Sequence, residues 1–272
     1  MKPLKLILVL SLSQLMVLQA SAQMEWNSMF TVAQAKAINQ NKLILIDFVA
    51  DWCGPCKMMD KEMWSKPEAA ELTANLIPLK VDIDRSPDLK AQYNITSIPR
   101  VLIVTPWGDI VWDETGYGGD GPYFSTFRKL PDDFGNVLKD AGVFMRNEAD
   151  YGDQFDLALR YQDLANEIDH KEMQMNLFRL SSNYLKTVEK KASSPSLVLE
   201  AEIHQYLNFA YMGKTKKAMK KIDKMDSDDP AVDELKSFVK AYCFKCDGED
   251  KKMEKEIKNI KNEQMLAKLK EQ

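Results

Sequence analysis

The sequence has few of the residues that bind metals, cross membranes or contact nucleic acids. Its 272 residues include only two histidines and four cysteines. No segment after the first 22 residues has the roughly 18 uninterrupted apolar residues of a membrane-spanning helix, and no cysteine precedes Cys53 to take a lipid anchor. Acidic residues outnumber basic ones by 41 to 37. This balance argues against a nucleic-acid partner, because nucleic acids select basic surfaces.

The N-terminus has the pattern of a secretory signal peptide. Lys2 and Lys5 precede an apolar stretch, residues 6–18, and Ala20-Ser21-Ala22 matches a cleavage site. We expect residues 1–22 to be removed and the mature chain to be a soluble exported protein, most simply periplasmic. Without the two lysines, 35 basic residues face 41 acidic ones, and the net charge changes from -4 to -6. In an oxidising compartment, a reducing protein would need an electron donor.

Two of the cysteines occur in the segment Trp52-Cys53-Gly54-Pro55-Cys56-Lys57, which follows an apolar run. Cysteines separated by two residues can close a small disulfide ring. A strand-to-helix turn here would place the first sulfur near the free N–H groups of a helix N-terminus, which favours the thiolate. The alternative, half of a zinc site, needs a second ligand pair, and His170 and His204 form none. The pattern therefore predicts a redox dithiol that uses no metal or other cofactor.

A single acid, Asp47, interrupts the apolar run from Leu43 to Ala50. It could occupy a solvent-facing position of the strand. A buried functional carboxyl is the favoured interpretation, because burying a carboxylate without a purpose is costly. Desolvation would raise its pKa and suit it to exchange protons with a thiol.

Up to about Leu130, strand-like and helical patterns alternate, which predicts an α/β domain over residues 23–130 with a mixed sheet. Expected strands are 42–50, 76–83, 101–104 and 110–113, the last two forming a hairpin; expected helices are one ending near 39–41, then 57–64, 66–74, 87–93 and 123–130. From Pro131 only helical periodicity remains, which predicts an all-helical domain over residues 131–272. Its expected helices are 136–148, 155–167, 173–190, 196–212, 215–225, 231–246 and 251–268.

The helical region shows weak self-similarity. Gly213 and Gly248 lie 35 residues apart, and so do Ile222 and Ile257. This spacing approaches the period of tetratricopeptide repeats, which usually present a surface for a protein partner. An irregular helical bundle is the alternative.

The combination of Asp47, the Trp52–Lys57 motif, Lys80 and Ile98-Pro99 resembles the thioredoxin family over about residues 26–130. The residues before the motif and the lead-in from Trp26 are more similar to the periplasmic C-terminal domain of the transmembrane thiol:disulfide interchange reductase. The resemblance implies a thioredoxin fold with Cys53 as nucleophile, Cys56 as resolving thiol, Asp47 as proton acceptor and Pro99 as a cis-proline facing the disulfide. It further implies that substrate contacts come from Trp52, Gly54, Pro55 and the backbone of Ile98.

These features predict an exported oxidoreductase that reduces protein disulfides. Its own disulfide would then be reduced again by a thiol protein, either membrane-bound or soluble. The Gly54-Pro55 dipeptide resembles that of the reducing members of the family. Thioredoxin-type dithiols have potentials of about -270 mV, well below the roughly -180 to -120 mV of the oxidising exchangers, so reduction is favoured. In this prediction the helical domain binds a protein partner. The alternatives are an oxidase or isomerase of secretory folding, and an adaptor or holdase whose dithiol is regulatory.

A second pair with the same spacing, Cys243 and Cys246, occurs within a predicted helix and near its apolar stripe. Three interpretations stay open at this point. The cysteines could be buried or locally bridged structural residues, a relay dithiol that exchanges with Cys53 and Cys56, or part of a metal site.

Overall fold

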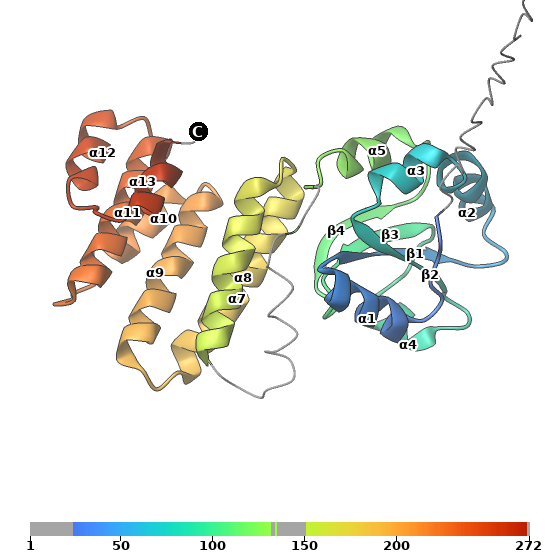
Figure 1. The fold of residues 1–272 in the computed structure, drawn as a ribbon, viewed down its shortest axis with the longest axis horizontal. Coiled ribbons are helices and arrows are strands. Elements are labelled where there is room, and N and C mark those ends of the chain that lie inside the picture. Colours follow the sequence, from blue (N-terminus) through green and yellow to red (C-terminus); the bar gives the residue numbers. More distant parts are fainter. Residues whose placement is uncertain (1–23, 132–133, 135–150, 271–272) are drawn as a thin grey trace, which may run out of the picture.

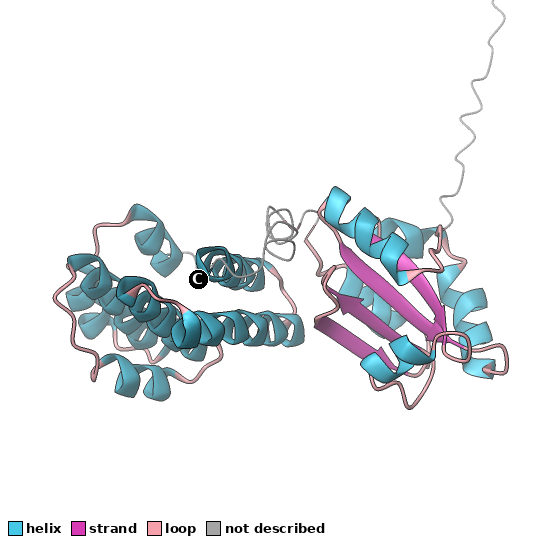
Figure 2. Cartoon of the chain, turned by 90° about the horizontal axis from the view of Figure 1, so that it is seen from below, coloured by secondary structure: helices cyan, strands magenta, loops and turns pink. Residues whose placement is uncertain are grey.

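The computed structural model describes residues 24–131, 134 and 151–270 (Figure 1). The predicted signal peptide and the predicted helix 136–148 lie outside the described residues. Among the described residues, four strands lie in the N-terminal part, while the C-terminal part is helical (Figure 2). Within the described ranges, no helix is both long enough and apolar enough to span a membrane.

The strands form one mixed sheet in the order β2-β1-β3-β4. Their bounds are β1 Leu43–Val49, β2 Leu76–Asp82, β3 Arg100–Val104 and β4 Ile110–Thr115. Strand β1 is parallel to β2 and antiparallel to β3, and β3 forms the predicted hairpin with β4. The helices beside the sheet are α1 Phe30–Gln40, α2 Gly54–Met59, α3 Pro67–Leu72, α4 Pro87–Gln92 and α5 Gly121–Phe127. The predicted α/β fold class is therefore confirmed.

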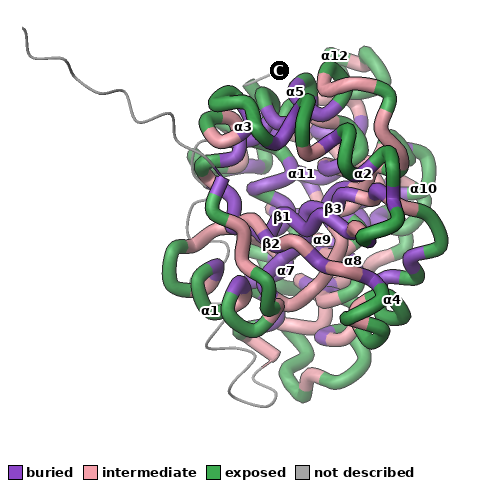
Figure 3. The backbone as a smooth tube through the Cα atoms, turned by 90° about the vertical axis from the view of Figure 1, so that its right-hand side faces the viewer, coloured by how far each residue is buried: buried purple, intermediate pink, exposed green. Residues whose placement is uncertain are grey.

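Strand β1 is apolar nearly throughout because both of its faces are covered. Leu43 and Leu45 belong to the buried cluster beneath α2, α3 and α5, and Ile44, Ile46 and Phe48 belong to the cluster beneath α1 and α4. Figure 3 shows β1 and β3 as buried segments in the middle of the α/β part. The residues that follow β1 are thereby held on a rigid central element.

Both edges of the sheet are covered by other parts of the chain. At the β2 edge, the backbone N–H of Asn27 donates to the Pro78 carbonyl at 2.9 Å. At the β4 edge, the Asn176 side chain, from helix α8 (Lys171–Lys191), donates to the Val111 carbonyl at 3.0 Å. Exposed strand edges can pair with other chains, and these contacts block that route.

The helical part contains α7 Tyr151–Glu167, α8, α9 Pro195–Tyr211, α10 Thr215–Ile222, α11 Pro230–Cys246, α12 Asp250–Ile257 and α13 Glu263–Lys270. The prediction of a single helix over 251–268 is wrong. The Glu234 carboxylate accepts from the backbone N–H groups of Lys261 and Asn262, both at 2.6 Å. The Asn262 side chain then accepts from the N–H of Gln264 at 2.9 Å. These bonds hold the chain in a non-helical turn between α12 and α13.

The weak self-similarity of the sequence corresponds to two matching helix pairs. Helices α9 and α11 each have 17 residues and begin 35 positions apart, and α10 and α12 each have eight residues at the same offset. Gly213 and Gly248 occupy equivalent turns with φ angles of 74° and 71°, which glycine adopts without a Cβ clash. Each turn is followed by a lysine over a phenylalanine ring, Lys217 on Phe209 and Lys252 on Phe244.

Helices α7 and α8 share a hydrophobic core with the sheet. One buried cluster contains Val111, Trp112 and Phe127 together with Leu164 of α7 and Leu177 of α8. The predicted boundary near residue 130 therefore separates two types of secondary structure, but the two sides pack as one body at this cluster.

We expect Leu177→Ala to lower the free energy of unfolding by about 2–5 kcal/mol, because it leaves a cavity in the shared cluster. All five tryptophans lie between Trp26 and Trp112, so their fluorescence reports on the α/β part alone. Far-UV circular dichroism reports on both parts. We expect both signals of Leu177→Ala to move to lower denaturant concentration.

The matched control is Leu235→Ala on α11, whose side chain lies in a separate cluster of the helical part. It should shift the fluorescence transition less than Leu177→Ala does. An unchanged fluorescence transition in Leu177→Ala would contradict the shared core.

Candidate active site

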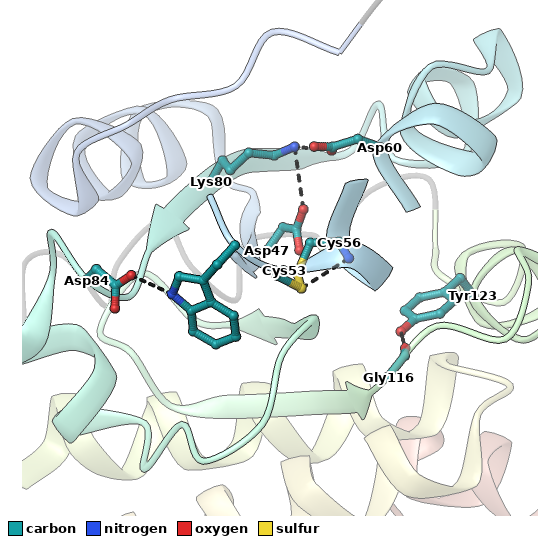
Figure 4. The surroundings of a disulfide bond; sticks show 9 residues. Asp47, Cys53, Cys56, Asp60, Lys80, Asp84, Gly116 and Tyr123 are labelled. Atoms are coloured by element: carbon teal, nitrogen blue, oxygen red, sulfur yellow. Dashed lines mark hydrogen bonds and ion pairs between the residues drawn. A yellow bond between two sulfur atoms is a disulfide. The ribbon is translucent and has the colours of Figure 1, made fainter. Parts of the chain in front are cut away.

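Cys53 and Cys56 form a disulfide at the point where β1 leads into α2 (Figure 4). Cys53 is the N-cap of α2, and the backbone N–H of Cys56 donates to its sulfur at 3.1 Å. Each cysteine is only 3% exposed. The predicted strand-to-helix turn and the pairing of these two residues are therefore present, and the two sulfurs are bonded to each other as a redox dithiol in its oxidised form.

The surface beside the disulfide is open. Trp52 is 68% exposed, and its indole N–H donates to the Asp84 carboxylate at 2.8 Å. Gly54 and Pro55 are also exposed, and a Cβ added at Gly54 would meet nothing within 4 Å. A macromolecular substrate could therefore approach the buried sulfurs from this side.

The peptide bond between Ile98 and Pro99 is cis, as the resemblance implied. Ile98 packs against the buried cluster that contains Cys53 and Cys56. The Pro99 carbonyl accepts from the backbone N–H of Gly116 at 2.8 Å. The contact of this segment with an extended substrate stays a prediction.

Asp47 is 1% exposed, which confirms the predicted buried carboxyl. The register of the parallel pair β1–β2 places Asp47 directly beside Lys80, and the Lys80 Nζ lies 3.6 Å from Oδ2 of Asp47. The same Nζ forms a hydrogen-bonded ion pair with Asp60 and lies 4.6 Å from the ring centroid of Trp26. Lys80 thus lies between a buried and a partly exposed carboxylate (Figure 4).

Burial raises the pKa of Asp47 from its usual 3.8 to about 7. The nearby Asp60 carboxylate also raises this pKa, while the Lys80 ammonium lowers it. A carboxyl with this pKa is populated in both protonation states near neutral pH. It can therefore accept a proton from a thiol and return it.

Asp60 is a site residue that the sequence analysis missed. It begins a π-helical turn, Asp60–Trp64, which follows α2 where one continuous helix was predicted. Such turns often occur at functional sites. The only sequence signal was a spacing of four residues from Cys56. The partner of Asp60 is Lys80 on β2, and that proximity is a property of the tertiary fold.

The second cysteine pair differs from the first. Cys243 is fully buried with its sulfur 3.8 Å from the Thr215 carbonyl, whereas Cys246 is exposed, and neither forms a disulfide. The interpretation of two buried or bridged structural cysteines therefore holds only for the burial of Cys243, while Cys246 is exposed and hydrogen-bonds to Tyr242 of the apolar stripe. Burial raises the pKa of the Cys243 thiol to about 12 and also raises that of Cys246. Because the thiolate is the nucleophile, these directions speak against a relay dithiol.

A mixed sheet with flanking helices, a disulfide at a strand-to-helix turn and a buried acid behind it together define a thiol–disulfide oxidoreductase. The thioredoxin family profile matches residues 28–117. Thioredoxin 1 of Chlorobaculum tepidum is 38% identical over 73 residues, which are 27% of this chain and 69% of that protein. The chain belongs to the thioredoxin family.

Two further comparisons also matched thioredoxins. Thioredoxin of Chlamydia trachomatis is 51% identical over 61 residues, which are 22% of this chain and 57% of that protein. A thioredoxin structure from Thermus thermophilus has 16% identity and a TM-score of 0.38, and covers 44% of this chain and 96% of its own. Over the first four curated relatives, the matched part is 44% to 69% of their length.

We expect Asp47→Asn to stabilise the oxidised protein at pH 8 and to have little effect below pH 4. The carboxyl binds a proton more tightly in the folded state, so its contribution to stability is present below its usual pKa of 3.8 and is lost as the pH rises through about 7. The increase of the pKa from 3.8 to about 7 corresponds to a loss of roughly 4 kcal/mol from the free energy of unfolding at pH 8. Guanidinium unfolding at the two pH values measures the difference.

Asp51→Asn is the matched control, because the Asp51 side chain is 87% exposed. Its stability relative to the wild type should not change between the two pH values. Equal stability of Asp47→Asn and wild type at pH 8 would be inconsistent with a buried carboxyl of raised pKa.

Proposed function

We propose that the protein reduces disulfide bonds in exported protein substrates and that its helical part binds a protein partner. The observation that carries this proposal is the buried carboxyl of Asp47 beside the Cys53–Cys56 disulfide, whose neighbours Trp52, Gly54 and Pro55 are exposed. Export rests on the signal-like residues 1–22, and the Gly54-Pro55 dipeptide favours reduction over oxidation.

In the reduced protein, the Cys53 thiolate attacks one sulfur of the substrate disulfide. A mixed disulfide forms, and the other substrate sulfur leaves as a thiolate. Cys56 then loses its proton to Asp47 and attacks the Cys53 sulfur. This step releases the second substrate thiolate and leaves the Cys53–Cys56 disulfide, so two electrons pass from the protein to the substrate.

A new cycle requires two electrons from a donor. We propose a thiol protein, membrane-bound or soluble, because the open rim of Trp52, Gly54 and Pro55 can admit a second protein by the same route. The matching helix pairs α9–α10 and α11–α12 support a tetratricopeptide-like role for the helical part. Stacked repeats of this kind expose an extended surface to partners.

Cys53→Ala should abolish the reduction of insulin disulfides, and Cys56→Ser should accumulate mixed disulfides that are stable until a reductant is added. Cys246→Ser is the matched control, and its turnover should equal that of the wild type. Turnover that persists in Cys53→Ala would falsify the proposed reaction. A midpoint of about -150 mV in a glutathione series would show instead that the protein oxidises its substrates.

Asp60→Asn should shift the pH profile of insulin reduction to lower pH. Removing this carboxylate leaves Lys80 to interact with Asp47 alone, and both changes lower the pKa of Asp47. Rates measured between pH 5 and 9 give the profile. Glu62→Gln, an exposed acid in the same turn, should leave it unchanged; a profile of Asp60→Asn that overlays the wild type would rule out this influence.

A further inference from the structure

Helix α13 folds back across the helical part and contacts α7. Lys268 Nζ lies 2.6 Å from the Asp163 Oδ1 of α7, although the two residues are 105 positions apart in the chain. Lys245 of α11 donates to the Leu269 carbonyl at 2.7 Å. Of the eight residues of α13, only Leu269 is buried. Met265 and Leu266 are half-buried and pack against the same cluster as Leu269, so α13 is held by one apolar face and by these two polar contacts.

A groove of about 590 Å³ lies between α13 and helices α7, α9 and α11. Its lining comes from four helices: Asp163, Asn166 and Glu167 of α7, Tyr211 of α9, Tyr242 of α11, and Gln264, Ala267 and Lys268 of α13. The residues from α7 and α13 are exposed, so the groove is open to solvent.

The chemistry of this groove favours a basic ligand with an apolar side chain. Tyr211 and Tyr242 have ring centroids 4.8 Å apart in an edge-to-face arrangement, and such rings accept aliphatic groups and cations. Asp163 and Glu167 supply two carboxylates, and Lys268 is the only cation in the lining. With α13 moved aside, the remaining lining is acidic and aromatic.

Helix α13 itself supplies some of the groups that such a ligand would have. Lys268 pairs with Asp163, and the adjacent Leu269 is buried in the cluster of α9 and α11. Toward the groove, however, α13 presents only Gln264, Ala267 and Lys268, which are too small or too polar to fill it. The groove is thus occupied incompletely by a segment of this chain.

We propose that the groove between α7, α9 and α11 binds a basic segment of a partner protein and that α13 is its resident competitor. A lysine or arginine of the partner binds Asp163 and Glu167, and an aliphatic side chain packs on Tyr211 and Tyr242. This inference rests on the proposed docking role of the helical part, but it does not depend on the dithiol chemistry.

The test uses the full chain and a fluorescent peptide with the sequence of residues 263–270. Lys268→Glu in the chain replaces the ion pair with Asp163 by a repulsion and weakens the attachment of α13. We expect this variant to bind the peptide about fivefold or more tightly than the wild type does, as judged by fluorescence anisotropy. Circular dichroism verifies that each variant is folded, and insulin reduction by Lys268→Glu should equal that of the wild type.

Two controls test the charge complementarity. A peptide with glutamate in place of Lys268 should not bind the Lys268→Glu chain, and adding Asp163→Lys to that chain should remove binding of the original peptide. If the folded Lys268→Glu chain binds no more tightly than the wild type, or binds both peptides equally, α13 only covers the neighbouring cluster and the proposal is wrong. Neither result would alter the Cys53→Ala test of the dithiol reaction.

Discussion

Burial of the Asp47 carboxyl is the constraint on which the active site depends. Strand β1 can be covered on both faces only if its side chains are apolar, and Asp47 is the one acid among them. The parallel register with β2 places Lys80 beside it, but the 3.6 Å separation and the competing Asp60 leave the buried charge only partly compensated. The carboxyl can therefore gain or lose a proton near neutral pH, within the strand that leads to Cys53.

The helical part contributes to the fold of the α/β part as well as extending the chain. Helix α8 covers the β4 edge through Asn176, and α7 and α8 complete the cluster around Trp112. The matching pairs α9–α10 and α11–α12 then extend away from the sheet. In Figure 1, α2 and α13 lie at opposite ends of the molecule. The dithiol and the proposed docking groove are thus separate surfaces on one framework, so changes at one can be made without disturbing the other.

Much of the fold could be predicted because its signals are local. The apolar run of β1, the hairpin of β3 and β4 and the helical periodicity after Pro131 each follow from short-range patterns. The helix ends were less predictable. The break between α12 and α13 depends on Glu234, which lies more than 25 residues earlier in the chain. Hydrophobic periodicity depends only on neighbouring residues in one segment. The Glu234 hydrogen bonds depend on which segments pack against each other in the folded protein.

The sequence by itself identified the reacting groups: the spacing of Cys53 and Cys56 permits their disulfide, and a lone acid in an apolar run favours a buried carboxyl. Only the tertiary structure decided what surrounds them. Strand register brought Lys80 to Asp47, a π-helical turn brought Asp60 to Lys80, and the return of α13 brought Lys268 to Asp163. These pairs join residues far apart in sequence, and their proximity follows from the packing of whole elements.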